Sequence, residues 1–84
     1  MIVRMWEVKA HPEAMHEALC WVCEAGVPAL EHHPQHVSSE VLSSADNRIV
    51  VVSRWRGDPV TPADPPRHLI ERAGHWWDFS PVDR

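Results

Sequence analysis

The stretch RIVVVSRW, residues 48–55, decides the fold of this chain. Its β-branched residues lie between two turn-forming segments, ADN before it and RGDP after it, which is typical of a β-strand. In a sheet with one face in water, apolar and polar side chains alternate along each strand. Residues 49–52, IVVV, are apolar at both parities, so we expect both faces of this strand to be covered.

The segments at the amino end predict a strand followed by a helix. Residues 2–9, IVRMWEVK, are rich in β-branched and aromatic residues, and Pro12 suits the first turn of a helix. Apolar residues then recur every three or four positions from about 12 to 32, which predicts one helical face. Pro28, with Gly26 shortly before it, predicts a kink or a break in this helix.

The rest of the chain predicts a hairpin, a long loop and a last strand. In order, we expect a strand at 36–44, the turn ADN, the strand at 48–55, a loop at 56–66 with four of the eight prolines, a turn or two of helix in RHLIERAG and a strand at 75–82. Pro81 places the last strand at an edge or marks its end.

This order, β-α-β-β-(short α)-β, is that of a ferredoxin-like α+β fold with an antiparallel sheet. A chain of 84 residues makes one domain, residues 1–84. Its one substantial helix covers one sheet face only. If about five large apolar side chains stay exposed to water, the protein loses ~1.5–3 kcal/mol of burial free energy for each of them. The sum is comparable to the whole free energy of unfolding of a small domain. We therefore expect a homodimer, in which a second copy covers the other face.

Charge and composition narrow the class of partner. The net charge is −4 and the eight Lys and Arg residues are scattered, so we expect neither nucleic acid nor a membrane surface as a partner. Charged residues in MIVRMWEVKA exclude the apolar core of a signal peptide. A cytoplasmic protein is the expectation.

Four segments resemble the antibiotic biosynthesis monooxygenase-like family of the dimeric α/β-barrel superfamily. They are MIVRMWEVK at the start, VPALEHHPQHVSSEVL from helix to strand, VVVSRWRG at the strand end and RHLIERAGHWWDFSPV at the close. The resemblance spans nearly the full length. It implies that two ferredoxin-like protomers press their sheets together into a dimeric α/β barrel, in agreement with the apolar run at 49–52.

The resemblance also implies an activity, although the residues for it differ. Characterised members are mostly cofactor-free oxygenases of polycyclic aromatic substrates, and relatives degrade haem. They use an Asn on an early strand and a Trp on the helix before the last strand. In this chain the only Asn is Asn47, in the predicted hairpin turn, and Tyr is absent. The segment RHLIERA stands in place of the helix before the last strand, and its only His is His68. The family chemistry therefore does not transfer residue by residue.

Cys20 and Cys23 have the C-x-x-C spacing but not the position of a redox pair. A redox pair places its first Cys at a helix amino terminus, whereas these lie two turns inside the predicted helix, near Glu17 and Glu24. We expect packing or surface thiols. With His16 they fall at i, i+4 and i+7, ligand types that zinc accepts, so metal binding stays open as an alternative. We expect no metal site and no cofactor.

Five tryptophans in 84 residues are the other unusual feature. Trp6 and Trp55 fall on strands expected to be neighbours, and Trp76 and Trp77 point to opposite faces of the last strand. Their plain interpretation is core and dimer interface. The functional interpretation is an aromatic pocket for a planar molecule, lined by Trp6, Trp55, His68 and Trp77.

Two residues are candidates for chemistry at such a pocket. His75 shares a face with Trp77, and its imidazole could act as general base on a phenol. Arg54, or Arg4, could stabilise a phenolate or peroxide anion, unless it is merely paired with an acid at the surface. The hypothesis is a small cofactor-independent monooxygenase-like enzyme for an aromatic or polyketide-type metabolite. The alternative is a non-catalytic dimeric ligand-binding or accessory protein.

Overall fold

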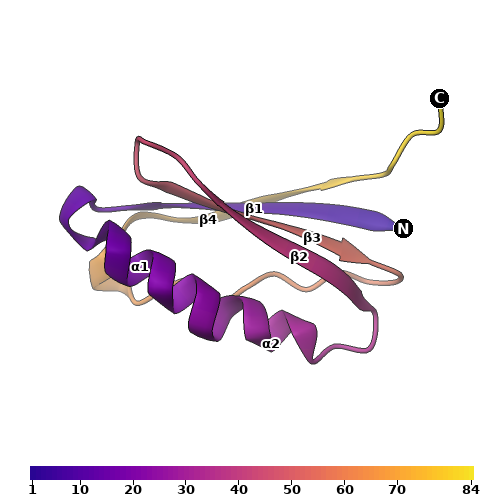
Figure 1. Cartoon of the computed structure of the whole chain (residues 1–84), viewed down its shortest axis with the longest axis horizontal. Coiled ribbons are helices and arrows are strands. Elements are labelled where there is room, and N and C mark those ends of the chain that lie inside the picture. The colour runs from indigo at the N-terminus through magenta and orange to yellow at the C-terminus, as the bar shows by residue number, and fades with distance from the viewer.

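The computed structural model describes all 84 residues, Met1–Arg84. Four strands, a two-part helix and short helical turns follow one another along the chain (Figure 1). The strands are β1 (Ile2–Ala10), β2 (His36–Ser43), β3 (Arg48–Trp55) and β4 (Ile70–Phe79), and the helical segments are α1 (Met15–Trp21) and α2 (Val27–Glu31), with 3-10 turns at Pro12–Ala14 and Arg67–Leu69. The predicted ferredoxin-like α+β architecture is confirmed.

The strands form one antiparallel sheet in the order β2-β3-β1-β4. β1 is central and pairs with β3 on one side and β4 on the other, so Trp6 lies opposite Val51 and opposite Trp76. The prediction that Trp6 and Trp55 lie on neighbouring strands is confirmed, since β1 and β3 are adjacent in the sheet.

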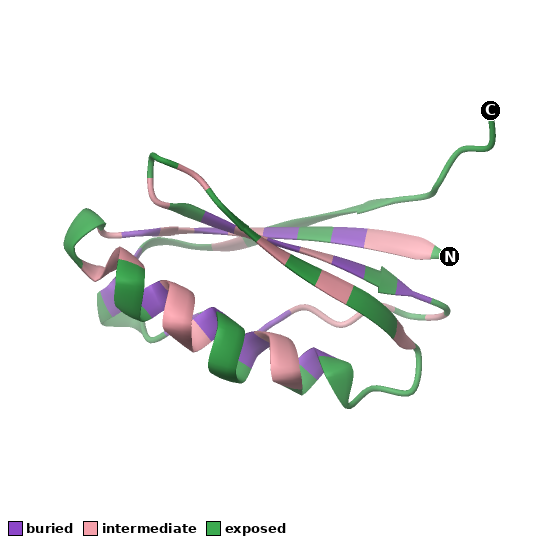
Figure 2. Cartoon of the chain, viewed as in Figure 1, coloured by how far each residue is buried: buried purple, intermediate pink, exposed green.

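The helix lies across one face of this sheet, which we call the inner face, and no element covers the other, the outer face (Figure 1). Buried and less buried positions alternate along the strands (Figure 2). In β3, Ile49 and Val51 are fully buried on the inner face, while Val50 and Val52 on the outer face are only half-buried. The core is built from inner-face and helix residues: Trp6, Val8, Ala10, Ala18, Val22, Leu30, Ile49, Val51, Trp55, Leu69 and Ile70. Of the four apolar residues at 49–52, two are therefore covered on the inner face and two are left uncovered on the outer face.

A wide turn joins the two parts of the helix at the predicted break. Residues Val22–Gly26 form a π-helical turn, in which the N–H of Val27 bonds to the carbonyl of Val22. A proline inside a regular helix clashes with the carbonyl four residues before it, and the wider turn relieves this clash before Pro28. The interruption is a widened turn, with right-handed helical dihedrals on both sides.

The proline-rich segment 56–66 covers the part of the inner face that the helix leaves free. Pro59, Pro62 and Pro65 recur every three residues, the period of a polyproline helix. Pro62 and Pro65 are buried, so this stripe faces the protein. The segment is loop, as predicted.

The prediction of a turn or two of helix in residues 67–74 is only partly correct, and the predicted start of the last strand is wrong. RHLIERAG forms only the 3-10 turn Arg67–Leu69, and β4 begins at Ile70 rather than at His75. Ile70 is buried and pairs with Ala10 of β1, and this tertiary pairing prevails over the helix-forming residues that follow it. β4 is an edge strand and ends at Phe79, in agreement with the position of Pro81.

Gly74 allows β4 to lie close to the core. A Cβ at this position would collide with the indole Nε1 of Trp6 and lie 2.7 Å from a carboxylate oxygen of Asp64, which accepts a hydrogen bond from the Gly74 N–H at 3.1 Å. The indole ring is packed in the core, so it has little room to move.

Replacing Gly74 with Ala should therefore lower the free energy of unfolding by about 1–3 kcal/mol, the usual cost of overpacking. Urea denaturation of the parent and the variant measures the difference. Gly57→Ala is the matched control, because its Cβ would meet only the flexible side chain of Gln35, at 3.1 Å. Equal stability of the two variants would contradict this account of Gly74.

Candidate functional site

The two predicted catalytic residues lie on the outer face and are not brought together. His75 pairs with Glu7 in β1, whereas Arg54 of β3 pairs with Val3. They are thus two strands and four residue pairs apart, a Cα separation of roughly 17 Å from ordinary sheet spacings. The ring of His75 does lie beside Trp77, with centroids 6.4 Å apart, as their shared parity predicts. Within one protomer the two residues therefore share a face of the sheet but are not neighbours.

The four predicted pocket residues are also dispersed. Trp6 and Trp55 are buried on the inner face, 2% and 0% exposed, while Trp77 lies on the outer face. His68 is exposed in the 3-10 turn, 3.7 Å from a carboxylate oxygen of Glu17. Side chains of the core pack between helix and sheet, and the protomer shows no pocket there. Trp6 and Trp55 are core residues, in agreement with the plain interpretation of the tryptophans.

Trp55 shows how the core absorbs a polar group. Its indole Nε1–H donates to the Ser53 hydroxyl at 2.8 Å, and that hydroxyl lies 3.5 Å from the carbonyl of Arg4. Ser53 and Trp55 are 1% and 0% exposed. The ring is thus fixed in place as a structural element.

Sequence reasoning missed a cluster of three side chains on the inner face, made by Arg4, Trp76 and Asp78. The Nε and Nη2 atoms of Arg4 donate to the two carboxylate oxygens of Asp78 at 2.7 and 2.9 Å. Its guanidinium carbon lies 3.8 Å from the centroid of the Trp76 ring. Arg4 is only 8% exposed and is the one buried charged residue, whereas Trp76 is 51% exposed. Arg4 is therefore not the surface ion pair that we considered from the sequence.

One signal in the sequence could have pointed to this cluster. Arg4 has the same parity as Trp6 and Val8 on β1, so it must point toward the core. An inward-pointing arginine needs a carboxylate partner, because an unpaired buried charge costs several kcal/mol. Asp78, with the parity of Trp76 on the neighbouring strand, supplies it.

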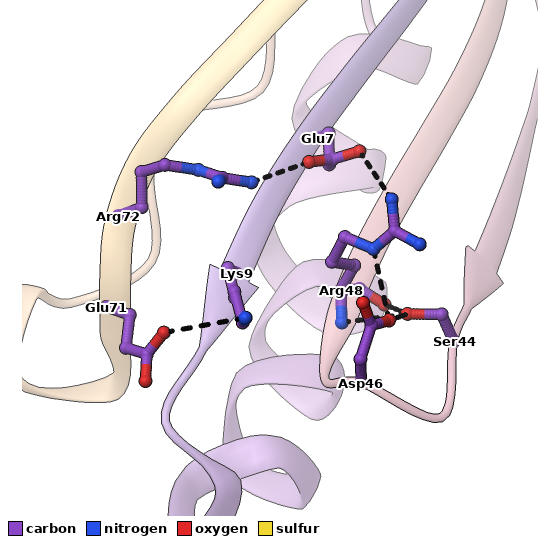
Figure 3. Close-up of polar contacts among 7 residues, drawn as sticks. All are labelled: Glu7, Lys9, Ser44, Asp46, Arg48, Glu71 and Arg72. Atoms are coloured by element: carbon purple, nitrogen blue, oxygen red, sulfur yellow. Dashed lines mark hydrogen bonds and ion pairs between the residues drawn. The ribbon is translucent and has the colours of Figure 1, made fainter.

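The outer face divides into an apolar part and a charged part. The apolar patch, as we call it, is made by Val3, Met5, Leu42, Val50, Val52, Trp77 and Phe79. In the charged part, Glu7 lies between two guanidinium groups, at 2.7 Å from Arg72 and 3.6 Å from Arg48 (Figure 3). Lys9 pairs with Glu71 at 3.8 Å beside them. A hydrogen bond from Ser44, then one from Arg48, lowers the pKa of Asp46 at the rim of this network.

The cysteines on the helix are free thiols. Cys20 is half-buried and Cys23 exposed, and the Cys20 Sγ lies 3.6 Å from His16 Nε2. No group of three or more side chains of the metal-ligating types is gathered in this structure.

Comparison with solved structures places this arrangement among known folds. The structure of Rv0793 from Mycobacterium tuberculosis superposes with a TM-score of 0.69 over 99% of this chain and 96% of that one, at 16% sequence identity. The crystal structure of an antibiotic biosynthesis monooxygenase superposes with a TM-score of 0.70 over 99% of this chain and 100% of that one, at 13% identity. The chain has the antibiotic biosynthesis monooxygenase fold.

The resemblance read from the sequence is thus confirmed for the monooxygenase-like fold. No protein-family model matches the chain, and no curated protein matches it in sequence. No helix in this structure has both the length and the apolar character that a membrane span requires.

The ion pair in the inner-face cluster predicts a specific acid sensitivity. Hydrogen bonds from Arg4 lower the pKa of Asp78 below its ordinary value of 3.8. A carboxyl group whose pKa is lowered by folding stabilises the protein above its unfolded pKa and loses this contribution as the pH falls through the folded value. The contribution should be complete at pH 5 and above, and it should shrink progressively as the pH falls from 3.8 through the lower pKa of the folded state.

Asp78→Asn should therefore be less stable than the parent at pH 6, and the difference should shrink as the pH falls below 3.8. Urea denaturation at several pH values measures this. Asp83→Asn, in the carboxyl-terminal segment beyond β4, should show no such pH-dependent difference. A gap between parent and Asp78→Asn that stays constant down to pH 2 would refute the pairing.

Proposed function

We propose that the protein is a homodimer whose protomers meet through their outer sheet faces. The support is the apolar patch, where Met5, Trp77 and Phe79 are 36%, 48% and 52% exposed in the single chain. Monomeric proteins rarely leave large contiguous apolar patches in water. The flanking charged network has three bases and three acids, so it presents no net charge to a second copy. The bases are Lys9, Arg48 and Arg72, and the acids are Glu7, Asp46 and Glu71.

We infer that the role of this dimer is to bind planar aromatic metabolites without catalysing a reaction. One observation carries this proposal: the half-exposed indole of Trp76, which the Arg4 guanidinium holds in place from the core. A fixed aromatic ring at a surface is a stacking platform for another planar ring. The filled interior favours binding over catalysis, since enzymes usually sequester their reactions from water. The free thiols at Cys20 and Cys23 fit a reducing compartment such as the cytoplasm.

The second candidate is a cofactor-independent monooxygenase-like enzyme for an aromatic or polyketide-type metabolite. It is favoured by the fold match to an antibiotic biosynthesis monooxygenase. In this case His75 would act as base from the outer face, and Arg54 could complete a site only if the partner subunit supplied it. Oxygen consumption with added phenols separates the candidates, since only the enzyme takes up oxygen.

The dimer proposal is tested by placing a charge in the apolar patch. Trp77→Asp would bury an unpaired carboxylate between the two sheets, so association should weaken at least about 100-fold, while each protomer stays folded. Light scattering gives the mass, and circular dichroism reports the fold. Trp77→Leu, which keeps an apolar side chain, should remain dimeric. A folded Trp77→Asp variant with the same mass as the parent would sink the proposal.

The binding proposal is tested with 2-naphthamide, a neutral planar probe. The five tryptophans give five indole N–H signals in a nitrogen-15 spectrum, and the Trp76 signal should shift most on titration. Trp76→Ala should lower the affinity about three- to tenfold, as expected for losing one aromatic stack. Trp77→Phe is the control and should keep the parent affinity. Shifts confined to other tryptophans would rule out Trp76 as the platform.

A further inference from the structure

The Arg4 guanidinium has hydrogen-bonding capacity that the protein does not use. A guanidinium group has five N–H donors. Two donate to Asp78 at 2.7 and 2.9 Å, and a third, from Nη1, reaches the carbonyl of Pro59 only at 3.5 Å, the limit of a hydrogen bond. Five donors minus these three bonds leave two N–H groups without an acceptor in the protein. A buried cation with spare donors is a site where an additional oxygen ligand is stabilised.

The carboxylate that neutralises this cation is much easier to move than the cation itself. The Arg4 side chain is 10% exposed, while that of Asp78 is 36% exposed. Asp78 is also the penultimate residue of β4, an edge strand that pairs on one side only. Its side chain can turn into water without opening the core, whereas Arg4 is fixed between the central strand and the Trp76 ring.

We propose that Arg4 binds the acidic oxygen of an aromatic ligand, a carboxylate, phenolate or enolate, in exchange for Asp78. The inference rests on the proposed stacking platform and deepens it, because it names the chemical class of the ligand. The guanidinium carbon lies 3.8 Å over one face of the Trp76 ring, so an anion held by Arg4 places its aromatic body against the edge of the indole. Asp78 then acts as an internal competitor that keeps Arg4 neutralised until a ligand arrives.

This competition separates the proposal from a purely structural ion pair. If Asp78 competes with the ligand, removing its charge frees Arg4 and strengthens the binding of anions only. If the pair is only a clamp between β1 and β4, removing the charge loosens the site and weakens the binding of every ligand.

The experiment compares 2-naphthoate with 2-naphthamide, which have the same ring system and differ in charge. Both are titrated into the dimeric parent protein and into Asp78→Asn, with the Trp76 indole signal as readout. Asp78→Asn should bind naphthoate at least about tenfold more tightly than the parent, while its affinity for naphthamide changes less than about twofold. Asp83→Asn removes the same charge outside the site and should change neither affinity.

Three results would overturn the inference: no gain in naphthoate affinity, an equal gain in Asp83→Asn, or weaker binding of both probes. If naphthamide binds the parent and only the naphthoate gain is missing, the acidic-ligand inference fails and the platform stands. If naphthamide shifts no Trp76 signal in the parent, the platform itself fails.

A measurement on the parent protein covers the case in which Asp78→Asn does not fold. Naphthoate should shift the carboxyl carbon-13 signal of Asp78 as this side chain leaves Arg4, and naphthamide should not. An unchanged Asp78 signal at saturating naphthoate would contradict the exchange.

Discussion

The sheet of this protein carries apolar side chains on both faces, but the rest of the chain covers only one of them. The other features of the structure depend on this constraint. The helix and the proline-rich segment both lie on the inner face, where they bury Ile49 and Val51. The outer members of the same run, Val50 and Val52, have only the side chains of neighbouring strands around them. No helix or loop of the structure covers these side chains, and the proposed dimer would cover them with a second copy of the same face.

Two contacts with side chains of the central strand, in addition to the backbone pairing, hold the edge strand β4 in place. Gly74 lets the backbone lie against Trp6, and Asp78 pairs with the buried Arg4. The proline-rich segment crosses the same region, where the Asp64 side chain accepts the Gly74 N–H and the Pro59 carbonyl lies near Arg4. These contacts leave Trp76 at the boundary between core and water, which is why we propose it as the stacking platform.

The sequence predicted those elements in which local pattern and tertiary role agree. The paired strands at 36–44 and 48–55, the interrupted helix and the antiparallel order follow from periodicity, turn residues and Pro28. The start of β4 could not be predicted from the sequence. The polar residues after Ile70 suit a helix, and they form a strand only because they pair with β1. The register between β1 and β4 also shifts between Glu7 and Ala10, an irregularity at which Gly74 is the one signal in the sequence. The site was harder still: parity could show that Arg4 points inward, but it could not show that Trp6 and Trp55 are packed into the core and do not line a pocket.

The mass of the parent protein in solution tests the central claim most directly. Sedimentation equilibrium at micromolar concentration should give about twice the 9.6 kDa of the chain, because the apolar patch is then shared between two copies. A mass of one chain that persists as the concentration is raised a hundredfold would contradict the account.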